Sequence, residues 1–209
     1  MSPTIPGPAY RIVTHRLVIR CYEPADAQML EESVNASREH LLPFMPWAYD
    51  LPMPFQDQLA LVRRFRGNFD LGNDYVYAVL NPEETRVLGG TGLHTRVGAH
   101  AREIGYWIHV DFAGQGFATE LSAALTRVAF EVDGVNRIEI HCDPENVRSA
   151  NVPRKLGYTH EATLRNRITR HDGSLRDAMI WTLLREEYPN SPSASAQIEA
   201  FDAIGRKIL

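Results

Sequence analysis

Two glycines in one turn, Gly114 and Gly116, are the residues of this chain best suited to approach a charged ligand. An apolar, strand-like run over residues 104–110 precedes the turn, and a long helical pattern follows it. One face of that pattern carries Leu121, Ala124, Leu125, Val128 and Ala129. The first amides of a helix have no acceptor within the helix, and the helix dipole adds a partial positive charge there. Because glycine has no side chain to keep a phosphate away, the turn predicts a binding site for linked phosphates.

The turn differs from the two best-known phosphate-binding loops. No Gly-Lys-Ser or Gly-Lys-Thr follows the glycines, which argues against a nucleoside triphosphatase. Thr119 stands where the dinucleotide-binding fingerprint has a third small residue, and the turn does not follow a first strand. We therefore expect a phosphate-bearing ligand of another kind. The alternative is a tight connection between a strand and a helix with no ligand at all.

A second polar segment begins where the strand-like run Arg137–Cys142 ends. Asn146 and Ser149 are residue types that cap the start of a helix. Gly157 suits the C-terminal end of that helix, and Pro153 predicts that the helix is short or kinked. A strand, a polar turn and a helix thus follow one another here, as they do around the glycine turn.

The rest of the sequence reads as a single α/β unit without internal repeats. Strands are expected over residues 11–22, 75–80, 87–95, 104–110, 137–142, 158–169 and 175–184, and helices from Pro24, over 55–71, after Gly116 and after Asn146. Residues 43–54 form a proline-rich loop, and residues 171–174 predict a hairpin turn. After a linker at 189–193, the tail places four apolar residues on one helical stripe, Ile198, Phe201, Ile204 and Ile208. This stripe predicts a C-terminal helix that packs on the domain or on a twin subunit.

Composition and charge narrow the class of protein. The chain has 209 residues, 44% of them hydrophobic, which suits a globular protein with a substantial core. A formal charge of −4 argues against a nucleic-acid-binding protein. The sequence has no bilayer-spanning apolar run and no secretion signal at its start, so we expect a cytoplasmic protein without membrane attachment. Cys21 and Cys142 lie in strand-like runs and are expected to be reduced, buried thiols. The eight histidines show no metal-ligand spacing, so no metal site is expected.

Taken together, these segments resemble a known family. The runs Gln115–Ala118 and Lys155–Tyr158, with Asn146 and Ser149 between them, are similar to motifs of the GNAT superfamily of acyl-CoA N-acyltransferases. Within it, the chain resembles the Rim-type branch, which acetylates the N-terminal amines of ribosomal proteins. The likeness extends over residues 10–187 and includes Thr14–Arg20, Ser37–Leu41, Met45–Trp47 and Glu103–Ile108. At Ala113 the family often has arginine or glutamine, a polar contact that Gln115 would partly replace.

The resemblance implies an α/β (α+β) fold. Its central sheet would be mixed but mostly antiparallel, twisted, split in a V and flanked by helices. The acetyltransferase domain would cover residues 10–188, with an N-terminal extension at residues 1–9. Residues 189–209 would form the linker and the C-terminal helix.

The resemblance also implies acetyl-CoA as co-substrate, bound in the V, with the acetyl group passing directly to an amine. Backbone groups near His109 and Val110 would hold the pantetheine arm like an added strand, and an N–H near Val110 would polarise the thioester carbonyl. Asn146 would hold the strand-to-helix junction or contact the pantetheine, and Asn151 would be a further contact. The linked phosphates would be bound by the amides of Gly114, Gln115, Gly116, Phe117, Ala118 and Thr119.

Roles for the reacting side chains follow from the same likeness. Glu103 would be the general base, either directly or through a water, and His141 is the alternative candidate for that base. The alternative role of Glu103 is to pair with a cation. Ser149 would donate a proton or a hydrogen bond to the leaving thiolate, cap a helix, or do both. Pro153 stands where other members of the superfamily have a catalytic tyrosine, which excludes that mechanism here.

The sequence therefore predicts an acetyl-CoA-dependent N-acetyltransferase that acts on an amine, first of all a protein N-terminal α-amino group. Phe44 and Trp47 would wall the acceptor pocket, unless they serve packing alone. One alternative acceptor is a small polyamine-like or antibiotic amine. A catalytically inactive CoA-binding sensor or interaction module is the alternative from another class. The expected partners are the acceptor and a second copy of the chain in a homodimer, with no nucleic acid, membrane or metal.

Overall fold

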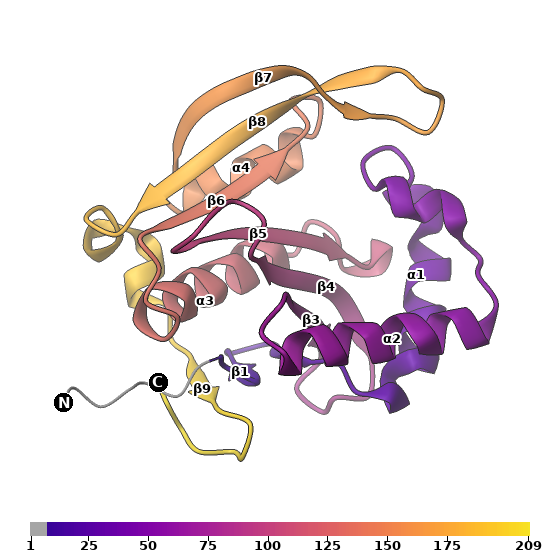
Figure 1. Cartoon of the computed structure of the whole chain (residues 1–209), viewed down its shortest axis with the longest axis horizontal. Helices are drawn as coiled ribbons and strands as arrows, with labels where there is room; N and C mark the ends of the chain where they lie inside the picture. The colour runs from indigo at the N-terminus through magenta and orange to yellow at the C-terminus, as the bar shows by residue number, and fades with distance from the viewer. Residues whose placement is uncertain (1–7) are drawn as a thin grey trace.

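The computed structural model describes residues 8–209, so the expected extension at residues 1–9 lies outside it except for Pro8 and Ala9. Figure 1 shows the helices and strands of this part of the chain. The helices are α1 (Ala27–Leu41), α2 (Phe55–Asp70), α3 (Phe117–Glu131) and α4 (Val147–Lys155). The strands are β1 (Arg11–Val13), β2 (Val18–Cys21), β3 (Tyr75–Leu80), β4 (Val87–His94), β5 (Ala101–Ile108), β6 (Arg137–Cys142), β7 (Thr159–Thr169), β8 (Leu175–Leu184) and β9 (Glu199–Phe201). None of these described helices is long and apolar enough to cross a membrane.

The strands form one sheet in the order β7-β8-β6-β5-β4-β3-β2-β1-β9. All neighbouring strands are antiparallel except β5 and β6. These two are parallel and pair only through Ala101–Glu103 and Arg137–Glu139, although β5 runs on to Ile108 and β6 to Cys142. The sheet therefore opens in a V beyond Glu103, and the predicted fold class is confirmed.

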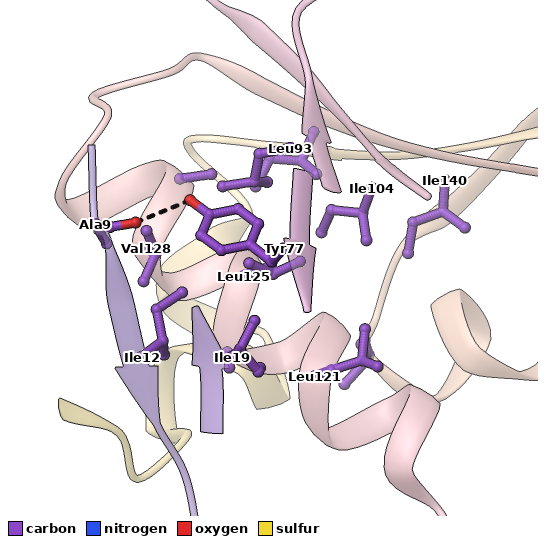
Figure 2. Packing of buried hydrophobic residues seen from close by; sticks show 14 of the residues in the cluster. Ala9, Ile12, Ile19, Tyr77, Leu93, Ile104, Leu121, Leu125, Val128 and Ile140 are labelled. Atoms are coloured by element: carbon purple, nitrogen blue, oxygen red, sulfur yellow. Dashed lines mark hydrogen bonds between the residues drawn. The ribbon is translucent and has the colours of Figure 1, made fainter. Parts of the chain in front are cut away.

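Helices cover both faces of the sheet. On one face, Leu121, Leu125 and Val128 of α3 pack in a cluster with Ile104 of β5 and Ile19 of β2, as Figure 2 shows. On the other face, α1 and α2 contribute to a second cluster with β2, β3 and β4, which contains Leu30, Val34, Val62, Val18, Ala78, Leu80 and Val87. Residues at successive positions of β2 face opposite clusters, as the alternation of a strand requires. The V thus opens in a sheet that is packed by helices on both faces.

One buried hydrogen bond ties the start of the described chain to the centre of the sheet. The Tyr77 hydroxyl donates to the carbonyl oxygen of Ala9 at 3.1 Å, and both residues are fully buried (Figure 2). Replacing Tyr77 by phenylalanine leaves that carbonyl without this donor, so we expect the free energy of unfolding to fall by about 1 kcal/mol. Denaturant titration measures this change. Tyr10→Phe removes an exposed hydroxyl bond to Asp70, at 2.9 Å, and is expected to change stability less.

The prediction of a single strand over residues 11–22 is wrong, because the structure has two strands there, β1 and β2. These strands pair antiparallel, with Arg11 opposite Arg20 and Val13 opposite Val18. The turn between them is closed by Thr14, whose amide donates to the Leu17 carbonyl at 2.9 Å and whose hydroxyl accepts the Leu17 amide at 3.0 Å. A side chain that bonds the backbone three residues further on makes a turn that apolar alternation does not reveal.

The prediction of a C-terminal helix in residues 189–209 is also wrong. Two 3-10 turns, Tyr188–Asn190 and Pro192–Ser195, occupy the linker, and the tail then forms β9. This strand pairs with β1 and turns Ala200 into the core, whereas Ile204 is 74% exposed. The open edge of β1 offers the tail backbone partners, and Tyr10 N–H donates to the Phe201 carbonyl at 2.8 Å. Without the helical stripe, this argument for a homodimer loses its basis, and the dimer stays a prediction.

Candidate active site

The glycine turn leads into α3 with the geometry that the sequence predicts. Gly114 and Gly116 have φ angles of +81° and +84°, which residues with a side chain rarely adopt. The Glu120 amide is the first to donate within the helix, to the Gly116 carbonyl at 3.1 Å. The amides of Phe117, Ala118 and Thr119 therefore have no acceptor within the helix and are available to an anion.

Arg16, from the turn between β1 and β2, braces this helix start. Its side chain donates to Glu120 at 2.7 Å and to the Gln115 carbonyl at 3.0 Å, and its guanidinium lies 4.4 Å from the centre of the Phe117 ring. The ion pair, the carbonyl bond and the ring contact fix the orientation of the turn. The sequence offered no sign of this brace, because Arg16 and Glu120 are far apart along the chain.

A cavity of about 860 Å³ lies over the helix start, between the ends of β5, α3 and α4. Seven of the ten predicted cofactor-binding residues line it: Gly114, Gly116, Phe117, Ala118, Thr119, Asn146 and Asn151. Arg148 and Lys155 of α4 line the same cavity and add two positive charges that suit phosphates, which our sequence analysis missed. We refer to this space as the donor cavity.

The other three predicted cofactor-binding residues do not line the donor cavity. The His109 amide donates to the Leu88 carbonyl at 2.8 Å, and the Val110 amide donates to the Ser37 hydroxyl at 3.1 Å. Neither N–H is free to polarise a thioester, so the expectation for His109 and Val110 needs correction. The Gln115 side-chain amide donates to the Asp111 carbonyl at 3.0 Å, so it does not replace the contact missing at Ala113.

The strand register shows which backbone groups face the V instead. The His109 amide donates to the Leu88 carbonyl of β4. In an antiparallel pair the hydrogen-bonded residues alternate, so Trp107 and Gly105 of β5 also direct their backbone N–H and C=O groups towards β4. The alternate residues, Tyr106 and Ile108, direct their N–H and C=O groups away from β4, towards the gap between β5 and β6. Both residues line the donor cavity. An extended ligand in the V therefore meets the backbone of Tyr106 and Ile108.

Ser149 and Tyr106 face one another at the end of the donor cavity. The Tyr106 hydroxyl and Ser149 Oγ lie 3.0 Å apart, and burial raises the pKa of Tyr106, which keeps the phenol protonated. The helix cap uses another group: Asn146 Oδ1 accepts the backbone N–H of Ser149 at 3.0 Å. The predicted cap of α4 by Asn146 is confirmed. The Ser149 hydroxyl has no part in that cap and is available for chemistry.

A second cavity, of about 770 Å³, lies on the α1 and α2 side of the sheet. Phe44, Trp47 and Glu103 line it, and Trp47 packs edge-on against Trp107 with ring centres 5.9 Å apart. The two cavities share Phe44, Met45, Tyr106, Trp107, Asn146 and Ser149. They therefore meet at the Tyr106–Ser149 pair. We refer to the second space as the acceptor cavity.

Glu103 is held by a cation. Arg96 donates to both of its carboxylate oxygens, at 2.8 and 2.5 Å. Burial pushes the pKa of Glu103 up, but the hydrogen bonds and the charge of Arg96 outweigh burial, so that the pKa lies below its ordinary value. A carboxylate that is stabilised in this way is a weak proton acceptor. The pairing role that the sequence left open is therefore present.

His141, the rival base, is also engaged. Its Nε2 lies 2.6 Å from a Glu139 oxygen, and its Nδ1 faces Glu103 at 3.7 Å. Cys142, next along β6, also lines the acceptor cavity. Burial raises the pKa of Cys142 to about 11, so its thiol stays protonated and is no nucleophile at neutral pH. Cys21 and Cys142 are both free and buried, as predicted.

Arginines outnumber acidic side chains around the acceptor cavity. Arg64, Arg96, Arg167 and Arg176 line it, against Asp50, Glu103 and Asp143. Arg176 and Asp143 form a buried ion pair at 3.0 Å, and Arg176 also donates to the Phe44 carbonyl at 2.9 Å. Since Arg96 and Arg176 each neutralise one acid, the wall is not acidic.

This fold and its two joined cavities suit an enzyme that binds a phosphate-bearing donor in one cavity and a separate acceptor in the other. A family model described as "Acetyltransferase (GNAT) domain" matches residues 16–159. The chain belongs to this family, and it is an acyl-CoA-dependent N-acetyltransferase of the Rim type.

A curated relative agrees with this assignment, and two solved structures share the fold. The [ribosomal protein uS5]-alanine N-acetyltransferase of Escherichia coli (strain K12) is 25% identical over 186 residues, which cover 87% of this chain and 94% of the relative. RimJ of Mycobacterium smegmatis, solved with a CoA disulfide, has a TM-score of 0.75 at 22% identity and covers 93% of this chain and 95% of that one. The microcin C7 self-immunity acetyltransferase MccE, solved with acetyl-CoA and AMP, has a TM-score of 0.74 at 18% identity, over 82% of this chain and 93% of that one.

Proposed function

We propose that this protein transfers the acetyl group of acetyl-CoA directly to the N-terminal α-amino group of a protein. The observation that carries the proposal is the junction of the donor and acceptor cavities at Tyr106 and Ser149. A thioester bound from one side and an amine bound from the other would meet at this pair. The uS5-alanine N-acetyltransferase relative supports an acceptor of this kind.

Acetyl-CoA would occupy the donor cavity along its whole length. Its linked phosphates would accept hydrogen bonds from the amides of Phe117, Ala118 and Thr119, with Arg148 and Lys155 nearby. The pantetheine arm would pair with the backbone of Tyr106 and Ile108, which face the V. This arrangement would bring the thioester to Ser149.

The reaction requires that the amine and the thioester be positioned, that the amine lose a proton and that the leaving thiolate gain one. The amine attacks the carbonyl carbon, an oxyanion forms, and the thiolate of CoA leaves. Ser149 would donate a proton or a hydrogen bond to that thiolate, and the buried Tyr106 hydroxyl would hold Ser149 in place. An α-amino group has a pKa of about 8, so a modest base is enough to provide its neutral form.

The charge of the acceptor cavity supports a peptide over a polyamine. A polyamine carries several positive charges, and these would meet a wall with four arginines and three acids. A protein N-terminus brings a single amine and a polar backbone. The alternative of an inactive CoA-binding module leaves the position of the Ser149 hydroxyl between the two cavities without a purpose.

Thiol release from acetyl-CoA tests the proposal directly. The acceptor panel contains peptides with alanine, serine or methionine at position one, the same peptides with a blocked N-terminus, spermidine and an aminoglycoside. We expect a free-amine peptide to give the highest kcat/KM, with mass spectrometry locating the acetyl group on the α-nitrogen. Faster transfer to spermidine or the aminoglycoside would overturn the proposal. Calorimetric CoA binding without thiol release from any acceptor would favour the inactive module.

A further inference from the structure

His94, the last residue of β4, forms a pair with Asp74 in the loop before β3. His94 Nδ1 lies 3.0 and 2.9 Å from the two oxygens of Asp74. Burial pushes the pKa of Asp74 up, but the hydrogen bond and charge of His94 outweigh burial, so that the pKa lies below its ordinary value. An ionised carboxylate only accepts hydrogen bonds, so the proton of the neutral imidazole sits on Nδ1. The lone pair is therefore on Nε2.

Two glycines direct the imidazole across the sheet. Gly92 and Gly105 face each other in the β4–β5 pair. A Cβ built on Gly92 would lie 2.7 Å from His94 Nε2, and one on Gly105 would lie 3.1 Å from it. Any side chain at either position would push the ring aside. The missing side chains thus leave room for the ring over both strands.

This orientation brings Nε2 towards the junction of the two cavities. His94 stands opposite Glu103, but its ring extends past that position to Gly105, the residue before Tyr106. By covalent geometry Nε2 lies within about 5 Å of the Gly105 Cα, to which the Tyr106 amide is joined through one carbonyl carbon. His94, Tyr106 and Ser149 all line the acceptor cavity. An amine that enters from the α1 and α2 side would pass Nε2 before it reaches the thioester.

His94 also differs from the other two candidates in what it has left to offer. Arg96 occupies both oxygens of Glu103, and carboxylates face both nitrogens of His141. Within residues 8–209, His94 Nε2 has no hydrogen-bond partner. Unlike Glu103 and His141, it is a proton acceptor of this cavity that no protein group already uses.

We propose that His94, oriented by Asp74, is the general base that takes the proton from the acceptor amine. The assignment rests on the proposed function. As the amine nitrogen bonds to the carbonyl carbon, the C–S bond breaks and the nitrogen loses one proton to Nε2. The sulfur takes one proton from Ser149, which recovers it from water, and His94 returns its own proton to water. Asp74 is a positioning residue, because it acts only through the ring.

His94→Gln is the first test. We expect kcat to fall about 100-fold or more, with acetyl-CoA affinity by calorimetry within about twofold of the wild type. The rate that remains should rise steadily with pH, because hydroxide must replace the base. Asp74→Asn should lower kcat less and alter the pH at which activity falls on the acidic side. His160→Gln, at an exposed histidine of β7, is the matched control and should leave kcat unchanged.

The pH profile has to be assigned among the charged groups around His94. Asp74, before β3, contacts His94 directly, and Arg96 after β4, Glu103 on β5, His141 on β6 and Arg64 on α2 line the same cavity. Profiles of Glu103→Gln and His141→Gln separate them. Loss of the acidic limb in His94→Gln, with the limb kept in the other two variants, supports the proposal. A 100-fold loss of kcat in Glu103→Gln with a nearly active His94→Gln overturns it.

A measurement that needs no acceptor separates this proposal from the proposed function. The ¹⁵N chemical shifts of His94, assigned by comparison with His94→Gln, report which nitrogen carries the proton at pH 8. We expect the proton on Nδ1 in the wild type and a shift of this balance in Asp74→Asn. A proton on Nε2 overturns the proposal whatever the acceptor is. If no peptide is acetylated while the Nδ1 proton is observed, the proposed function fails and the His94–Asp74 pair stands.

Discussion

Gly116→Glu is expected to weaken acetyl-CoA binding at least about 100-fold, which corresponds to about 2.7 kcal/mol. Gly116 immediately precedes α3 and has a φ of +84°, so a side chain there strains the backbone. The added carboxylate would also stand beside the amides of Phe117 and Ala118, where it repels phosphates and occupies the same donors. Isothermal titration calorimetry with acetyl-CoA measures the effect.

Gly134→Glu is the matched control for this change. Gly134 also has a positive φ, +69°, and no atom lies within 4 Å of its added Cβ. It follows α3 and lines neither the donor nor the acceptor cavity. The control therefore has the same charge and similar backbone strain, but it should bind acetyl-CoA normally. Near-normal binding by Gly116→Glu would show that the coenzyme does not use the start of α3.

Ser149→Ala is expected to lower kcat about 100-fold while acetyl-CoA still binds with near-normal affinity. The variant removes the hydroxyl that faces Tyr106 but keeps the backbone N–H that Asn146 accepts. Since the cap of α4 is preserved, the fold and the donor cavity should be unchanged. Steady-state thiol release measures kcat, and thermal denaturation checks the fold.

Ser149→Thr supplies the comparison, because it keeps a hydroxyl at the same position. We expect it to recover a large part of the lost rate. Equal kcat values for wild type and Ser149→Ala would rule out the proposed proton donation to the leaving thiolate. The Tyr106 hydroxyl would then be the next group to test.

The parts of the fold that the sequence predicts well depend on neighbours along the chain. The strand Arg137–Cys142 has the bounds that we expected, and α3 begins at Phe117, directly after the glycine turn. Asn146 caps α4 through a residue three positions away. Periodicity, glycine and capping residues act over a few residues, so a single sequence contains their signal.

The parts that were wrong or missing depend on residues that only the folded chain brings together. Arg96, which holds Glu103, and Asp74, which orients His94, carry no local mark of those roles. The backbone groups that face the V follow from the pairing of β5 with β4, and a shift of one residue exchanges His109 for Ile108. Apolar spacing also could not tell the β9 strand from a helix, because the decisive factor was the open edge of β1.

The pairing of β9 with β1 has a consequence for how the protein is made. β1 pairs with β2 early, but its outer edge finds its partner only when Phe201 has been synthesised. One edge of the sheet therefore has no neighbour while almost the whole nascent chain emerges from the ribosome. An unpaired edge strand can pair with another chain, and contacts between residues that are distant in the sequence form slowly. Expression at lower temperature or with chaperones that shield nascent chains should therefore raise the yield of folded enzyme.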